Sequence, residues 1–255
     1  MIQMKLHILR LVFLLSLTYN FAFAQPVTDD FILCHNALSH LSSGYKPTEQ
    51  EMAMMENSNR RSDSFDIWNY VIDIDVTNYA GKAIKANTAV RFRTRLDKLQ
   101  WIVLDLLDLQ VDSVYFEGKP VLFNYDSAQI VVFFGRELPY DHANQVTVYY
   151  HGVPSRDPVW GGFYFADDYI YNLGIGLSTT PPNFGKVWFP CFDNFVERST
   201  YDYYVTSTSD KKAYCVGTFM SEDSVGPSRI RRHYRMNTPI PTYLSSIAVA
   251  NYAVS

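Results

Sequence analysis

The stretch KVWFPCFDNFVERSTYDYYVT, residues 186–206, decides how the fold is interpreted. It begins with apolar residues and breaks at Pro190, which lacks a backbone N–H and therefore marks the end of a strand. Asp193 and Asn194 follow, and their short side chains favour a turn because they hydrogen-bond nearby backbone amides. Alternation resumes at 201–206, which predicts a strand. The stretch thus predicts a corner between two strands in which Pro190 and Asp193 have structural roles.

Period-two alternation of apolar and polar residues continues through most of the chain from residue 65 onward. Turn-forming residues separate the alternating segments, as at 79–82, 117–120 and 167–168. Short strands with turns between them and no long helical period indicate an all-β sandwich or extended β domain. The strands are expected at 70–77, 90–95, 101–107, 111–116, 121–125, 129–134, 144–151, 211–217 and 229–236.

Two of these strands, 70–77 and 90–95, carry opposite charges. Antiparallel pairing places Arg91, Arg93 and Arg95 on the same sheet face as Asp73 and Asp75, and cross-strand charge pairs favour that arrangement. A solvated strand face explains the arginine row better than an anion-binding site does.

Residues 1–24 have the layout of a secretory signal peptide. Lys5 and Arg10 precede an apolar run at 11–17, and small residues at 22 and 24 flank a cleavage site. The run is too short for a membrane anchor, so we predict an exported chain, periplasmic or extracellular, with no membrane span after signal removal. Residues 25–64 form a leader, with a short helix at 29–43 and a polar, loop-like segment at 44–64.

Composition limits the classes of function. Apolar residues make up 47% of the sequence, which supports a sizeable core, and the net charge is −4 with no basic cluster, which argues against a nucleic-acid partner. Three cysteines, Cys34, Cys191 and Cys215, leave at least one unpaired thiol, and whether Cys191 and Cys215 pair stays open. The sequence contains no Cys-x-x-Cys motif, so its cysteines do not indicate a zinc cluster.

The corner Phe189-Pro190-Cys191-Phe192-Asp193 resembles the F-P-C-F-D-E-P corner of the aminopeptidase N family, which are thermolysin-like zinc metallopeptidases of the gluzincin type. Further elements that resemble the family follow its order: Leu104-Asp105, 114–120, 149–152, Gly161-Gly162-Phe163 and Tyr243-Leu244. The resemblance covers residues 65–255. It implies the N-terminal domain of that family, a saddle-shaped, twisted antiparallel β-sandwich-like domain.

In that family an H-E-x-x-H motif and a downstream glutamate bind zinc, and the glutamate of the motif activates the attacking water. No His-Glu pair occurs in the 255 residues, and His142 and His151 lack a carboxylate at matching spacing. We therefore predict no catalytic residue, no metal and no other cofactor in this chain. Zinc is expected only if a catalytic domain is present elsewhere.

The resemblance also implies a contribution of this domain to the substrate cleft. In the family a Gln-x-Glu or Gln-x-Gln pair precedes the corner proline and faces the free amine of the substrate. The corresponding positions here are Thr179 and Pro181, which offer neither carboxylate nor amide. We expect the loop 177–183, with Thr179, Thr180 and Pro181, to line the cleft without the usual amine anchor.

Three hypotheses follow for function. The first is a non-catalytic N-terminal domain that packs on the catalytic domain of a metallopeptidase, in cis or in trans, and walls the cleft for a peptide substrate. The second is a stand-alone secreted binding or scaffold module that uses exposed aromatics around Trp160, Phe163, Tyr164 and Tyr169. The third, an enzyme with unfamiliar chemistry, has no supporting constellation of residues.

Overall fold

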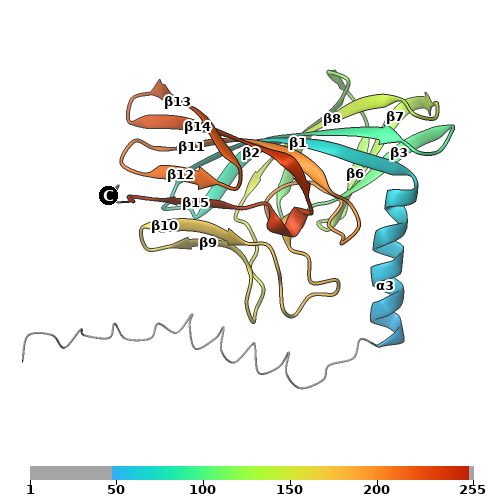
Figure 1. Cartoon of the computed structure of the whole chain (residues 1–255), viewed down its shortest axis with the longest axis horizontal. Coiled ribbons are helices and arrows are strands. Elements are labelled where there is room, and N and C mark those ends of the chain that lie inside the picture. The colour runs from blue at the N-terminus through green and yellow to red at the C-terminus, as the bar shows by residue number, and fades with distance from the viewer. Residues whose placement is uncertain (1–47, 253–255) are drawn as a thin grey trace, which may run out of the picture. The chain divides into compact units, whose positions relative to one another are not determined.

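The computed structural model describes residues 48–252, so the expected signal peptide and the expected helix at 29–43 lie outside the described residues. Within 48–252 the chain forms one α-helix, three short 3-10 turns and fifteen strands (Figure 1). The helical elements are α3 (Glu49–Arg60), η1 (Arg61–Asp63), η2 (Gly185–Val187) and η3 (Thr242–Leu244). The strands are β1 (Phe65–Asn78), β2 (Ala83–Thr94), β3 (Leu99–Asp105), β4 (Gln110–Phe116), β5 (Lys119–Pro120), β6 (Phe123–Tyr125), β7 (Gln129–Leu138), β8 (Ala143–Gly152), β9 (Gly162–Ala166), β10 (Tyr169–Leu173), β11 (Ser199–Thr208), β12 (Lys212–Cys215), β13 (Thr218–Gly226), β14 (Arg229–Ile240) and β15 (Ile247–Ala250).

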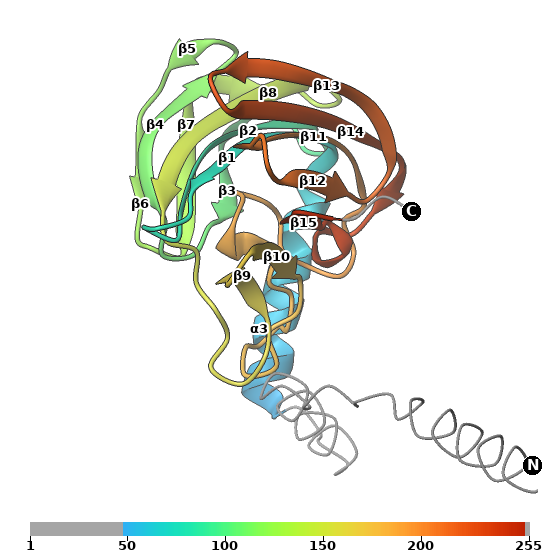
Figure 2. The same cartoon turned by 90° about the vertical axis from the view of Figure 1, so that its left-hand side faces the viewer.

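The strands form three sheets, which confirms the all-β, sandwich-like fold. The largest has eight strands in the order β13-β14-β11-β1-β2-β8-β4-β5, and the others are β12-β15-β10-β9 and β3-β7-β6. Figure 2 shows the large sheet arching over the four-stranded sheet. One pair, β1 with β11, is parallel, because more than a hundred residues separate these strands in the chain and allow a crossover. The large sheet is therefore mixed, whereas the other strand pairings within 48–252 are antiparallel.

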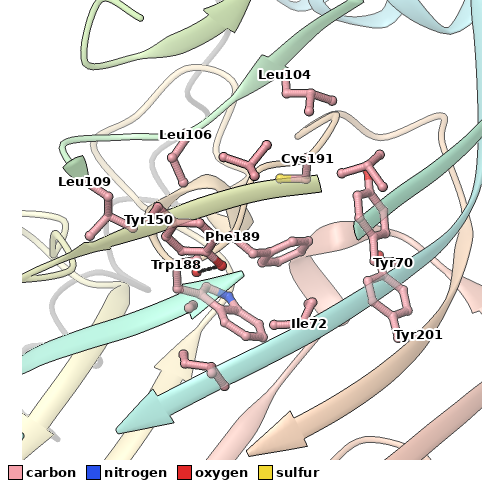
Figure 3. Packing of buried hydrophobic residues seen from close by; sticks show 14 of the residues in the cluster. Tyr70, Ile72, Leu104, Leu106, Leu109, Tyr150, Trp188, Phe189, Cys191 and Tyr201 are labelled. Atoms are coloured by element: carbon pink, nitrogen blue, oxygen red, sulfur yellow. Dashed lines mark hydrogen bonds between the residues drawn. The ribbon is translucent and has the colours of Figure 1, made fainter. Parts of the chain in front are cut away.

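The corner lies in the centre of the core (Figure 3). Phe189 packs edge-on against Tyr70 at 5.4 Å between ring centroids, and Tyr70 stacks on Tyr201 at 5.3 Å. The Tyr150 hydroxyl donates to the Trp188 carbonyl at 2.9 Å, which pairs a buried backbone oxygen. All five residues are fully buried, so the corner joins the large sheet to the rest of the core.

The expected charge pairing between β1 and β2 is wrong in its partners. The two strands do pair antiparallel, but Asp73 lies opposite Asn87 and Asp75 opposite Lys85. The two carboxylates instead form ion pairs with Arg231, at 2.7 Å, and with Arg229, both on β14. Arg91 is too far along β2 to reach Asp73, because it lies four residues from Asn87, the residue opposite Asp73. The long arginine side chains of β14 instead reach across β11 to β1.

Two segments without an expected regular structure are regular. The polar segment 44–64 contains α3, although a loop was expected, because a capping box at Thr48 and Glu51 starts a run of good helix formers. The helix buries no residue, so the sequence carries no apolar stripe to reveal it. The second is β13, an exposed edge strand whose Ser-Glu-Asp-Ser run reads as a turn.

The two described cysteines, Cys191 and Cys215, are free thiols and do not pair with each other. Burial raises the pKa of both thiols, so neither is a thiolate at neutral pH. Cys191 is part of the core cluster, where it packs as a small apolar side chain. Within 48–252 no helix has the length and apolar character needed to cross a membrane.

Candidate functional site

The corner is fastened to the end of β3. The Asp105 N–H donates to the Cys191 carbonyl at 2.7 Å, and the Cys191 N–H donates to the Asp105 carbonyl at 3.0 Å. The Asp193 N–H donates to Asp105 Oδ2 at 3.0 Å. Three hydrogen bonds therefore join the corner to β3, although the two segments are 86 residues apart in the chain.

The Asp193 side chain is almost fully buried and connects the corner to two other segments. Its Oδ1 accepts from the Thr242 hydroxyl at 2.6 Å, and its Oδ2 accepts from the Lys186 N–H at 3.2 Å. Burial raises the pKa of Asp193, while the charge of Lys186 and these hydrogen bonds oppose the shift. Pro190 beside it is also buried. These contacts are those of a structural carboxylate, and the structural roles of Pro190 and Asp193 stay predictions.

A buried ion pair ties the end of the leader to the same corner. The Arg61 guanidinium donates to Asp105 Oδ1 at 2.9 Å and to Oδ2 at 2.5 Å, with the two side chains 18% and 10% exposed. It also lies 5.1 Å from the centroid of the Phe192 ring. Burial disfavours the charge of Arg61, but the field and hydrogen bonds of Asp105 outweigh that and raise its pKa. Arg61, near the end of the expected leader 25–64, is thereby bonded to the corner.

The loop 177–183 is held in shape by Asp157. Asp157 Oδ2 accepts from the N–H and the hydroxyl of Ser178 at 2.9 and 2.7 Å, while Oδ1 accepts from the backbone amides of Val159 and Trp160. Burial alone would raise the pKa of Asp157, but these donors outweigh it and lower the pKa. The Gly176 N–H also donates to the Pro182 carbonyl at 2.8 Å, which closes the loop at its base.

These elements enclose a groove of about 700 Å³, called the α3 groove below. The structure brings Thr179, Thr180 and Pro181 together in its wall, as well as Asp193, whereas Pro190 is not part of the lining. The Thr180 hydroxyl lies 3.3 Å from Glu51 Oε1, so α3 forms the facing wall. The remaining lining residues are Met54, Asn57, Ser58, Arg61, Val103, Asp105, Leu107, Ala128, Gln129 and Lys186.

One cation of the α3 groove is available to a ligand. The Lys186 ammonium lies 6.0 Å from the centroid of the Phe184 ring and makes no hydrogen bond or ion pair with the part of the chain that the structure describes. Arg61 is occupied by Asp105, and Asp193 is buried. The groove therefore offers hydroxyls, amides, apolar side chains and one positive charge.

The described histidines and carboxylates were expected to hold no metal, and their arrangement bears on that expectation. No group of three or more His, Cys, Asp or Glu side chains there is placed to hold a metal ion, so these residues do not fit a zinc site. His142 contacts Asn144, and His151 contacts Asp112 at the surface.

Three residues of this site were not singled out from the sequence: Glu51, Arg61 and Asp157. A detectable signal existed for Glu51, because Thr48 and Glu51 have capping-box spacing. Arg61 and Asp105 are 44 residues apart, and Asp157 and Ser178 are 21 apart, so no local pattern links either pair.

Comparisons with known proteins agree with this fold. A variant M1 zinc metallopeptidase from Deinococcus radiodurans bound to a Tyr-Ser-Ala substrate superposes with a TM-score of 0.66 at 21% identity, covering 73% of this chain and 42% of that chain. The unmodified D. radiodurans enzyme gives 0.66 at 20% identity with the same coverage. Native yeast LTA4 hydrolase gives 0.60 at 16% identity, covering 76% of this chain and 30% of that chain.

No family model matches the sequence, and no curated protein matches it. The fold of the described domain is nevertheless that of a β-rich part of M1 zinc metallopeptidases, as the corner and the accompanying motifs implied. The chain spans less than half the length of these structural neighbours.

Proposed function

We propose that this chain is the non-catalytic N-terminal domain of an exported, aminopeptidase N-like zinc metallopeptidase. It packs on a catalytic domain, in cis or in trans, and walls one side of a substrate cleft with the loop 177–183. On its own it has no peptidase activity, and its zinc is bound by the catalytic domain.

The observation that carries this proposal is the partial coverage of the neighbours. The match spans most of this chain but only 42% of a zinc metallopeptidase that was solved with a peptide substrate. The described residues hold no metal-binding group of their own. A domain with this fold and without the ligands is best explained as the partner of a zinc-binding domain.

A surface suited to packing on another domain lies on the four-stranded sheet. Its inner face carries buried residues such as Phe163 and Ile170, whereas its outer face carries Tyr164, Tyr171 and Tyr214 in one row. Tyr169 and Tyr252, 53% and 37% exposed, extend this surface. The four-stranded sheet and α3 both lie below the large sheet in the view of Figure 1, and an exposed row of aromatic side chains is typical of a surface that another domain covers.

The same tyrosines are the specific support for the alternative, a stand-alone secreted binding or scaffold module. That hypothesis needs a correction, because Phe163 is only 2% exposed and packs against Trp188 in the core. Tyr169 remains exposed, and Tyr164 is half-buried in a stack with Tyr171 at 4.9 Å. Tyr214 and Tyr252 take the place of Phe163 in any such surface.

The experiment is a zinc assay on the purified chain, together with turnover of aminoacyl and peptide substrates. We expect a folded, metal-free and inactive protein. Stoichiometric zinc with chelator-sensitive hydrolysis contradicts the proposal. A metal-free, inactive chain that binds a glycan or peptide through the tyrosine row favours the stand-alone module instead.

A further inference from the structure

The outer edge of β3 has no strand partner over most of its length. β3 is an edge strand of its sheet, and no described strand pairs with that edge between Leu99 and Leu104. Its sequence there, LQWIVL, contains no charged residue and no proline, and Trp101 is 51% exposed. Natural edge strands are normally blunted by charges, prolines, bulges or covering segments. An uncharged edge with an exposed tryptophan therefore indicates a surface that a partner strand covers.

The backbone of β3 presents its hydrogen-bonding groups to this edge. Asp105 uses its N–H and carbonyl to bond Cys191, so both groups point away from β7. Register with β7 is continuous from Trp101 to Asp105, and orientation alternates in an antiparallel pair. The backbone N–H and carbonyl groups of Val103 and Trp101 therefore point to the outer edge of β3 as well. Arg61 Nη1 donates to the Val103 carbonyl at 3.5 Å, which agrees with this direction and occupies that carbonyl, so Val103 has only its N–H left for a partner.

The edge runs into the α3 groove, because Val103 and Asp105 line that groove too. The groove also offers apolar contacts from Met54 and Leu107, and Lys186 is part of its lining. The Asp105 carboxylate is paired with Arg61, and the Asp193 carboxylate on which the charge of Lys186 acts is buried. The Lys186 ammonium, which makes no hydrogen bond or ion pair with residues 48–252, is therefore the charge that a ligand meets there. A ligand that complements both features is an extended backbone with a negative side chain.

We propose that the edge of β3 and the α3 groove bind an extended acidic peptide segment by strand addition. The backbone of the peptide pairs with Trp101 and with the N–H of Val103, its side chains alternate between solvent and groove, and one carboxylate reaches Lys186. This goes beyond the proposed function, because it needs no catalytic domain. Its outcome is therefore separable from that of the zinc assay.

The first test uses a fluorescein-labelled octapeptide of alternating threonine and valine with one central glutamate, and a matched peptide with lysine in its place. Fluorescence anisotropy with the full chain is expected to show at least about tenfold tighter binding of the glutamate peptide. Lys186→Glu is expected to remove or reverse that preference. Lys212→Glu, at an exposed lysine on β12, serves as the control and leaves it unchanged. Equal binding of the two peptides by the unaltered protein overturns the proposal.

The second test leaves the protein unaltered and changes the backbone of the peptide. Two versions of the glutamate peptide carry N-methyl groups on alternate amides, one version on the odd positions and one on the even positions. Strand addition predicts that one version loses binding and the other keeps it, because only one set of amides faces β3. If both versions bind like the parent peptide, backbone pairing is wrong. If sedimentation shows that the edge joins two copies of this chain and the peptide does not compete, the occupant is a second copy and the proposal fails.

Discussion

At the scale of single residues, Gly161 occupies a position where both the backbone conformation and a neighbouring chain exclude a side chain. Its φ is +122°, and a Cβ built there lies 1.7 Å from the Ile175 carbonyl oxygen. Gly118 provides a comparison, because its φ is +77° but nothing lies within 4 Å of its Cβ position. The two glycines therefore separate strain of the backbone from close approach of a neighbouring chain.

We expect Gly161→Ala to lower the free energy of unfolding by about 3–5 kcal/mol, since strain and overlap act together. Gly118→Ala is the control and costs about 1 kcal/mol, because it faces strain alone. Urea unfolding of both variants measures the difference. Equal losses at the two positions would show that the approach of Ile175 is not a constraint in solution.

The ion pair between Arg61 and Asp105 is the second residue-scale feature that can be tested. Arg61→Ala leaves a buried carboxylate without its partner, so we expect a loss of about 3 kcal/mol. Arg60→Ala removes an exposed pair with Glu56, in which both side chains are 65% exposed, and is expected to cost less than about 0.5 kcal/mol. Chemical denaturation of the two variants measures both losses in the free energy of unfolding. Similar small losses would mean that the end of the leader is not fixed to the corner.

The lowered pKa of Asp157 predicts a pH dependence. A carboxyl whose pKa is lower in the folded than in the unfolded state adds stability that is fully present above its ordinary pKa, near 3.9. That stability declines as the pH falls from about 5 to below 4, because the unfolded state then takes up the proton first. We expect Asp157→Asn to lose stability at pH 7 and to show a weaker dependence on pH in this acid range. An unchanged acid dependence would contradict the role given to Asp157.

At the scale of elements, the pattern of alternation predicts strands well where one face is buried. The predicted strands at 129–134 and 144–151 correspond to β7 and β8, with ends displaced by a few residues. Alternation fails for β13, because both of its faces are exposed and pairing with β14 alone defines it. It also cannot reveal that β1 and β11 are parallel, since pairing partners distant in the chain leave no local signal. The α3 groove was not predicted from the sequence, although Thr179, Thr180 and Pro181 of the expected cleft loop are part of its lining.

The start of α3 yields a prediction at this scale. Thr48 accepts from the Glu51 N–H at 3.2 Å, and Glu51 Oε2 accepts from the Thr48 N–H at 2.7 Å. We expect Thr48→Ala to weaken the helix by about 1 kcal/mol and to speed hydrogen exchange of the α3 amides. Exchange in the large sheet stays unchanged, because α3 buries no residue. Gln50→Ala is the control, and an equal effect of both substitutions would argue against the capping box.

At the scale of the whole molecule, the described domain combines a metallopeptidase-like fold with no group of side chains placed to hold a metal ion in residues 48–252. The described domain has the fold of part of an M1 zinc metallopeptidase, and the corner holds β3, η2 and η3 together through hydrogen bonds of Asp193. The sequence motifs predicted this fold because the corner residues are constrained by contacts that any similar domain needs. They did not predict the α3 groove, because Arg61 and the α3 residues that line it lie outside the resemblance.

The most direct measurement is isolation of the native protein from its source with antibodies raised against this domain, followed by zinc analysis and peptide sequencing. We predict that zinc is recovered with a polypeptide that carries an H-E-x-x-H motif, either continuous with this domain or bound to it. Recovery of the domain without zinc and without any such polypeptide would contradict the proposed function.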